Sequence, residues 1–437
     1  MLTSNFKTRL IITDNYIVLL LIIALSGIMF DFIMAYFLSE LSGGPIFNSE
    51  GFISRSKNSL LNWSFYTSNR PFTTDLLYKI YGSNPPNAVI GQQILSAFSW
   101  TLLGFAVSLT IKRQLLSVLA LIIFPTLAFW WNITGWTYVM RSESSAFSLF
   151  AFWYAMMVLY HKYHWRILLV LLSVVTLFFS FTRDNIPYFL ILVAALMFVI
   201  SFRSQSKKQR RGWLSYVIIV VIIFTLQVIS AQIGARHQFP LINVIFKRIL
   251  VDEEKTHYFV SHGMPIDEDF ITRWKGQWAS SHNWALYKED KYEDFRNFTL
   301  HEGKYVYGLF LLSHADYTFK SAWDNRRSIF FVSNWYPKYT KNNFHNIVII
   351  SQFWELYSST TFLLILMSIL SLLFIRNYPY LFIIIPCTII NGIFIYHADA
   401  MEVIRHSLMI MIVLCTVSMH TLFKTLDTTR LSLHYCK

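Results

Sequence analysis

Long apolar runs separated by shorter polar segments dominate the pattern along this chain. Each run is about 20 residues long, which is the length that an α-helix needs to cross a hydrocarbon core of about 30 Å. Lipid offers the backbone no hydrogen-bond partner, so such runs are expected to be helical. The pattern predicts about ten membrane-spanning helices, at residues 16–38, 88–111, 115–136, 145–160, 167–182, 186–202, 213–234, 358–375, 380–397 and 406–423.

Two long polar segments interrupt this pattern. The first, 39–87, mixes Gly, Ser, Asn and Pro with aromatic residues, and the second, 235–357, carries three acidic clusters. Apolar residues recur at helical spacing within 285–313, which predicts short amphipathic helices there rather than strands. We therefore expect an all-α polytopic membrane protein in three parts. These are an N-terminal bundle of about seven spans at 1–234, which includes the first segment, the large loop 235–357, and three spans with a tail at 358–437.

Composition agrees with a membrane protein. Of the 437 residues, 55% are hydrophobic and only 14% are charged, which is too apolar for an ordinary soluble enzyme. The first apolar run is long and no small-residue cleavage site follows it, so we expect it to remain as the first span. The three cysteines show neither a metal-binding nor a disulfide pattern; they are Cys387, Cys415 and Cys436.

The net charge of +13 is distributed as membrane topology requires, which argues against nucleic acid as a partner. Three basic residues fall in short loops on one side of the membrane, namely Arg141, Arg183 and Arg405. Fifteen fall on the other side: Lys7, Arg9, Lys112, Arg113, Lys162, Arg166, Arg203, Lys207, Lys208, Arg210, Arg211, Arg376, Lys424, Arg430 and Lys437. The positive-inside rule predicts that both termini lie in the cytoplasm and that both large loops lie on the opposite side of the membrane.

Acidic residues near the first outer segment are candidates for a catalytic base. Glu50 is followed by Phe52, and an Arg70-Pro71 pair comes about twenty residues later. A carboxylate in an aromatic, partly desolvated pocket is suited to deprotonating a sugar hydroxyl. Glu40 and Asp31 are the alternatives, and Asp31 lies within an apolar run, where an ionisable group is a functional candidate. The competing interpretation is that all three are ordinary acids at the membrane surface.

The outer arginines Arg141, Arg183 and Arg405 form a second candidate group. Guanidinium groups at the membrane–water boundary would bind the phosphate of a lipid-linked donor and stabilise it as it departs. The acids nearest to them in the sequence are Glu143, Asp184 and Glu402. The alternative interpretation is that these acids simply neutralise snorkelling arginines.

No cofactor is predicted. The histidines of the large loop lack metal-ligand spacing, and the chain has neither a Gly-rich phosphate loop nor a recognisable hydrolase triad. Whether a divalent metal takes part stays open at this stage. Nucleotide-sugars are cytoplasmic, so a transferase that faces outward would need a lipid-linked donor.

This arrangement resembles the multi-span GT-C class of glycosyltransferases, which use polyprenyl-phosphate-linked sugars. Many of them carry an acid, an aromatic residue and, about twenty residues later, an Arg-Pro pair. The positions that match this pattern are Phe52, Ser54, Ser56, Leu60, Arg70 and Pro71. Asn48 stands where the class most often has its catalytic aspartate, so the resemblance implies that Glu50 substitutes for it, or that Glu40 or Asp31 acts instead.

Within that class, the length, the span count and the two unequal outer loops resemble the type-specific O-antigen glucosyltransferases of serotype-converting bacteriophages. The resemblance implies transfer of glucose from undecaprenyl-phosphate-glucose to lipid-linked O-antigen, a lipopolysaccharide precursor. It places the protein in the bacterial inner membrane, with both large loops in the periplasm. It implies that the donor phosphate is bound by Arg70, Arg141, Arg183 and Arg405. A small flippase and a polyprenyl-phosphate glucosyltransferase would be functional partners. An O-antigen polymerase and a non-enzymatic polyprenyl-glycan flippase or transporter are the alternatives.

Overall fold

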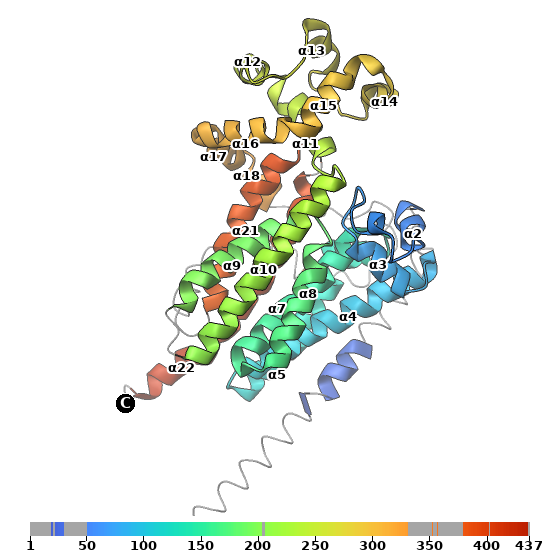
Figure 1. The fold of residues 1–437 in the computed structure, drawn as a ribbon. Coiled ribbons are helices and arrows are strands. Elements are labelled where there is room, and N and C mark those ends of the chain that lie inside the picture. Colours follow the sequence, from blue (N-terminus) through green and yellow to red (C-terminus); the bar gives the residue numbers. More distant parts are fainter. Residues whose placement is uncertain are drawn as a thin grey trace, which may run out of the picture.

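The computed structural model describes residues 19–20, 22–29, 50–202, 206–330, 352, 356, 379–401 and 403–435. Within these residues the chain is helical and has no β-strand, which confirms the all-α prediction (Figure 1). Three described helices are long and apolar enough to cross a membrane. They are α4 (Pro85–Thr110), α10 (Lys207–Ile233) and α22 (Val403–Tyr435), the last over residues Val403–Thr428.

The other helices of the bundle are shorter and also follow the apolar runs of the sequence. They are α5 (Gln114–Thr126), α7 (Ser142–Tyr163), α8 (Arg166–Ser180), α9 (Ile186–Ser201) and α21 (Pro379–Ala398). Helix α4 packs on α5 and α7, and α9 packs on α10 and α21. The expected run 358–375 and most of 16–38 lie outside the described residues.

The run 115–136 is not one helix, so the prediction of a continuous span there is wrong. Helix α5 ends at Thr126, a 3₁₀ turn follows at η2 (Leu127–Phe129), and a short helix, α6 (Trp131–Thr137), completes the run. Pro125 lies in the last turn of α5, where its missing N–H and its ring disfavour continuation of the helix.

The core of the bundle is centred on α7, which is buried on almost every side. The indole N–H of Trp153 donates to the Tyr216 hydroxyl of α10 at 2.8 Å, so a buried polar group is satisfied inside an apolar core. Helix α10 lies at the edge of the bundle and exposes apolar side chains such as Ile218 and Ile222. This is the pattern of a helix with one face toward lipid.

One end of the bundle collects basic residues. Asp427 of α22 accepts hydrogen bonds from the backbone N–H groups of Lys112 and Arg113 at 3.1–3.2 Å, which caps the start of α5. Lys162 and Lys424 donate to carbonyl oxygens at the C-terminal end of α4. Four of the basic residues that the charge pattern assigns to one side therefore lie together.

The large segment is predicted to form short helices over 235–357, and its described part, residues 235–330, does so at the opposite end of the bundle (Figure 1). Nearly all of 331–357 lies outside the described residues. These helices are α11 (Gln238–Val244), α12 (Glu253–Ser261), α13 (Glu268–Trp274), α14 (Ser281–Lys288), α15 (Glu293–His301), α16 (Gly303–Ser313), α17 (Ala315–Asp324) and α18 (Arg326–Phe330). They share a core that includes Phe246, Phe259, Trp274 and Phe295.

The first outer segment packs against the same end of the bundle. It contains α2 (Glu50–Ser56), η1 (Trp63–Phe65) and α3 (Thr73–Ile80), which lie beside the outer ends of α8 and α10 (Figure 1). The Ser230 hydroxyl of α10 donates to the Tyr66 carbonyl oxygen at 2.6 Å, and the Thr73 N–H donates to the Phe181 carbonyl oxygen at 3.1 Å. These bonds hold the segment that carries the Arg70-Pro71 pair against the bundle.

We expect Gly234→Ala to loosen this contact. Gly234 ends α10, and a Cβ there would overlap the backbone carbonyl oxygens of Thr67 and Ser68, which cannot rotate away as a side chain can. The expected cost is about 1–3 kcal/mol, measured as a lower Tm in detergent. Gly308→Ala is the matched control, because a Cβ at that position has no heavy atom within 4 Å. Equal Tm values for the two variants would contradict the close packing.

Candidate functional site

The four arginines that the sequence singled out come from four separate elements. Arg141 immediately precedes α7, Arg183 follows the end of α8, Arg405 lies in the first turn of α22, and Arg70 lies shortly before α3. The start of α7, the end of α8 and the start of α22 lie at the same end of the bundle, beside the first outer segment (Figure 1). The fold therefore brings together residues that are up to about 330 positions apart.

A buried carboxylate lies at the centre of this group. Glu143 of α7 is fully buried, and its Oε1 lies 3.6 Å from Nη1 of Arg183. The Nε of Arg405 donates to the same oxygen. Two guanidinium groups thus share one carboxylate, which leaves this buried cluster with a net positive charge.

The ion pairs in the structure differ from those expected between residues that are close in the sequence. Asp184 pairs with Arg236 at 3.1 Å instead of with Arg183, and it also accepts a 2.9 Å hydrogen bond from Gln227. Arg141 forms no salt bridge with another residue that the structure describes. It occupies the N-cap position of α7 with an extended backbone, and its side chain makes no capping hydrogen bond. Glu402, the expected neighbour of Arg405, lies outside the described residues.

Arg183 also organises a histidine. One of its guanidinium nitrogens, Nη2, lies 2.7 Å from Nδ1 of His406, and the His406 Nε2 lies 3.0 Å from a carboxylate oxygen of Asp399. Arginine can only donate, so Nδ1 must accept and the ring hydrogen belongs on Nε2, facing Asp399. The chain Glu143–Arg183–His406–Asp399 therefore has one consistent set of donors and acceptors.

Arg70 and Arg141 supply positive charge without a counter-ion in the described part of the chain. The Arg70 guanidinium stacks on the Phe52 ring, 4.6 Å from its centroid. Burial lowers the pKa of Arg70, and the neighbouring charges of Arg55 and Arg141 lower it further. The nearby Asp75 carboxylate partly opposes this lowering of the pKa. An arginine stays protonated at neutral pH, so Arg70 places a half-buried positive charge beside those of Arg55 and Arg141. Such a place favours a bound anion.

Helix α2 is oriented by a pair that the sequence analysis missed. Arg55 donates to Asp75 of α3 through Nε at 2.8 Å and through a second nitrogen at 3.4 Å. Burial raises the pKa of Asp75, although the Arg55 charge partly opposes that shift. This pair holds the helix whose first residue is Glu50. No local periodicity links positions 55 and 75, so only their spatial contact reveals the pairing.

The predicted catalytic acids lie at the limit of what the structure describes. Glu50 begins α2, but its side chain is outside the described residues, as are Glu40 and Asp31. The structure therefore describes the arginine half of the predicted site. Within the described residues, no group of three His, Cys, Asp or Glu side chains could hold a metal ion.

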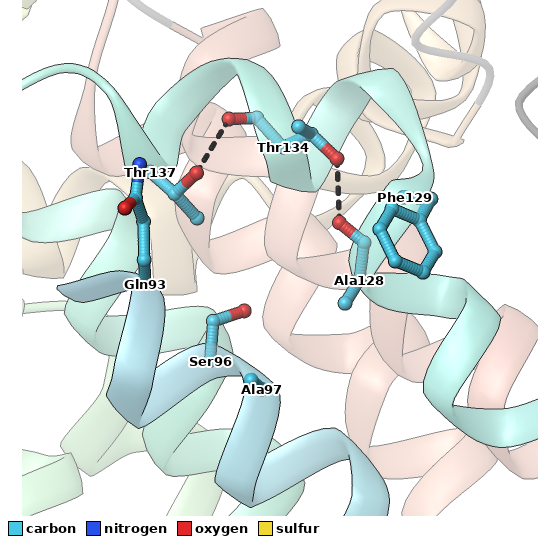
Figure 2. Close-up of a pocket in the computed structure, with 7 residues that line it drawn as sticks. All are labelled: Gln93, Ser96, Ala97, Ala128, Phe129, Thr134 and Thr137. Carbon is cyan, nitrogen blue, oxygen red and sulfur yellow. Dashed lines mark hydrogen bonds between the residues drawn. The ribbon is translucent and has the colours of Figure 1, made fainter. Parts of the chain in front are cut away.

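A small cavity lies between α4 and the segment that contains η2 and α6 (Figure 2). Its volume of about 10 Å³ fits one water molecule and not a sugar. The side chains that line it include Ser96, Thr134 and Thr137, and the two threonine hydroxyls donate to backbone carbonyl oxygens. Trp136 of α6 lies under Arg405, with 5.6 Å between the guanidinium carbon and the ring centroid. Helix α6 therefore contributes both to the wall of the cavity and to the contact with Arg405.

Comparison with known proteins returns no match to a protein-family model and none to a curated protein. Any function proposed for this chain therefore comes from its own residues and their geometry.

We expect Glu143→Gln to destabilise the protein by about 3–5 kcal/mol, because it leaves Arg183 and Arg405 buried without their shared carboxylate. Thermal unfolding in detergent would show this as a large fall in Tm. Glu254→Gln, at an exposed position in the first turn of α12, is the control and should change Tm little. A Glu143→Gln variant as stable as the control would show that the ion pairs of Glu143 with Arg183 and Arg405 do not stabilise the packing of the helices.

Proposed function

We propose that this chain is a membrane glycosyltransferase of the GT-C type. It would transfer a sugar, glucose, from an undecaprenyl-phosphate carrier to lipid-linked O-antigen or a similar surface glycan. The observation that carries this proposal is the convergence of Arg70, Arg141, Arg183 and Arg405 at one end of an apolar helix bundle. A polyprenyl phosphate places its tail in lipid and its charge at the boundary, so this is the ligand whose shape and charge fit such a place.

The topology that we propose has ten spans, with both termini in the cytoplasm and both outer segments in the periplasm. Its support is the separation of basic residues within the bundle. Lys112, Arg113, Lys162 and Lys424 gather at the end opposite to the four arginines, as expected if their end is cytoplasmic. The site would then face the compartment that has no nucleotide-sugars.

The contact between Phe52 and Arg70 also supports membership of the GT-C class. Both residues belong to the pattern on which the resemblance rests, and they are 18 positions apart in the sequence. In the structure the guanidinium lies on the ring at 4.6 Å. Two elements of the motif therefore form one local unit, which also includes the helix that begins at Glu50.

In the mechanism that we propose, Glu50 removes the proton of an acceptor hydroxyl, with Glu40 or Asp31 as the alternative base. The hydroxyl oxygen then attacks the anomeric carbon of the donor sugar. The bond from that carbon to the phosphate oxygen breaks, and its electron pair leaves with the polyprenyl phosphate. Arg70 and Arg141 bind this phosphate directly, since neither is committed to a carboxylate within the described chain. Donors placed before the reaction stabilise the departing charge with little reorganisation.

Arg183 and Arg405 act differently in this proposal. Glu143 and His406 hold them in place, so they contribute a fixed positive field beside the phosphate. The helices α11–α18 lie over the same end of the molecule (Figure 1). We propose that they shape the acceptor groove and set the specificity for the glycan.

Arg70→Gln and Arg141→Gln should each lower sugar transfer by about 10²–10³-fold, because each removes a donor to the departing phosphate. Transfer of labelled glucose from undecaprenyl-phosphate-glucose in membrane vesicles would measure this. The Tm should stay near that of the wild type, since neither guanidinium is in a salt bridge with a described residue. Arg211→Gln, at an exposed position near the opposite end, is the control. Unchanged transfer in both variants would exclude the phosphate role.

Substitution of the three candidate acids tests which of them acts as the catalytic base. Of Glu50→Gln, Glu40→Gln and Asp31→Asn, we expect one to abolish transfer while the donor lipid still binds, since the phosphate site is intact. The measurements are turnover and binding of the donor lipid, and Asp269→Asn, an exposed acid of α13, is the control. If all three variants retained transferase activity, the catalytic assignment would be wrong.

A further inference from the structure

Helices α16 and α17 expose a set of large apolar side chains that no other described part of the chain covers. We define the α16–α17 face by these residues, which are Tyr305, Leu309, Leu312, Phe319 and Trp323. Leu312 is 80% exposed and Trp323 is 67% exposed. A face of this kind, formed by contiguous helices, marks an interaction surface.

The spacing shows that this face is built into both helices. In α16, residues 305, 309 and 312 recur on one side, while Val306, Tyr307 and Phe310 turn inward to the core shared by α11–α18. In α17, Phe319 and Trp323 are one turn apart. Helix α16 therefore has two apolar sides, and the fold of this chain buries only one of them.

Hydrogen bonds set the height of the face relative to the bundle. The Lys304 ammonium donates to the Gln232 side-chain oxygen at the outer end of α10. The Tyr307 hydroxyl donates to the His397 carbonyl oxygen at the outer end of α21 at 3.0 Å, and the His397 Nε2 lies 2.9 Å from the Thr318 carbonyl oxygen. The two helices thus lie across the outer ends of α10 and α21, and Figure 1 shows them crosswise above α21.

The apolar surface continues from this face onto the bundle. Ile233 is exposed at the end of α10, next to Gln232, and Phe394 is exposed near the end of α21. In the membrane placement proposed above, both side chains face lipid near the outer boundary. The α16–α17 face therefore adjoins a lipid-facing surface.

The charged residues around the face suit phospholipid headgroups. Lys304, Lys320, Arg326 and Arg327 outnumber Asp316 and Asp324 within residues 303–327. The Arg326 guanidinium carbon lies 5.0 Å from the centroid of the Trp323 ring, and the Lys304 ammonium lies 4.8 Å from that of Tyr305. Aromatic rings beside cations are typical of the membrane–water interface, where the ring enters the acyl boundary and the cation reaches a phosphate.

We propose that α16 and α17 form an interfacial hairpin that lies in the outer leaflet, with the α16–α17 face in contact with phospholipid. The hairpin holds the helices α11–α18 at a fixed height above the membrane surface. It would thus fix the distance between these helices and any substrate that arrives within the leaflet. The inference depends on the membrane placement of the bundle and not on the transfer reaction.

Site-directed spin labelling of the full chain in phosphatidylethanolamine–phosphatidylglycerol vesicles tests this placement. Labels are attached to Leu312→Cys and Phe319→Cys after Cys387, Cys415 and Cys436 are replaced by alanine. Ile222→Cys on the exposed side of α10 is the lipid control, and Glu268→Cys on α13, far from the bundle, is the water control. Collision rates with oxygen, which partitions into lipid, and with a water-soluble nickel chelate are measured at each site.

We expect the labels at 312 and 319 to collide several-fold more often with oxygen than with the chelate, as the label at 222 does, while the label at 268 shows the reverse. Chelate access at 312 and 319 equal to that at 268 would overturn the proposal and assign the face to water. Protection of both sites from both reagents would also overturn it, and would indicate a second copy of the chain as the occupant. High chelate access at 222 would contradict the membrane placement of the bundle, and with it the proposal for the hairpin.

Discussion

The carboxylate of Glu143 joins three helices, because Arg183 at the end of α8 and Arg405 at the start of α22 both pair with one oxygen of this α7 side chain. A charge in such an environment is stable only with opposite charges close by, since desolvation of an unpaired ion costs several kcal/mol. The requirement is mutual. The arginines need the carboxylate as much as it needs them, so the outer ends of these helices are held in a single arrangement.

This pairing determines which of the other charges at this end lack an opposite charge. Glu143 carries one negative charge and is shared by two arginines, so it leaves no net negative charge to balance Arg70 and Arg141. Asp75 is bound by Arg55, and Asp184 is bound by Arg236. Among the described residues, positive charge therefore remains next to an apolar bundle, held by a scaffold that does not need to rearrange. A site of this kind is suited to a lipid-linked phosphate, because both the tail and the charge find a compatible environment.

Attachment to the ends of the bundle helices links the first segment and the large segment. The first outer segment is held to α8 and α10 by backbone and hydroxyl hydrogen bonds, and it carries Arg70. The large segment is held to α10 and α21 through α16 and α17. Both parts thus take their position from the helix ends. An interfacial hairpin would use the membrane surface itself as a further support for the same geometry.

The sequence by itself determined where the helices lie, because helix formation in lipid depends on the length and polarity of each local run. It also determined which basic residues share an end, since charge near a helix terminus is a local property. Pro125 marked the break between α5 and α6, but the apolar run around it outweighed that signal. Only the tertiary structure decided the pairings. Glu143 pairs with Arg405, which is 262 positions away, and not with Arg141, which is two positions away. Contacts between distant helices depend on how the whole bundle packs, and no local pattern contains that information.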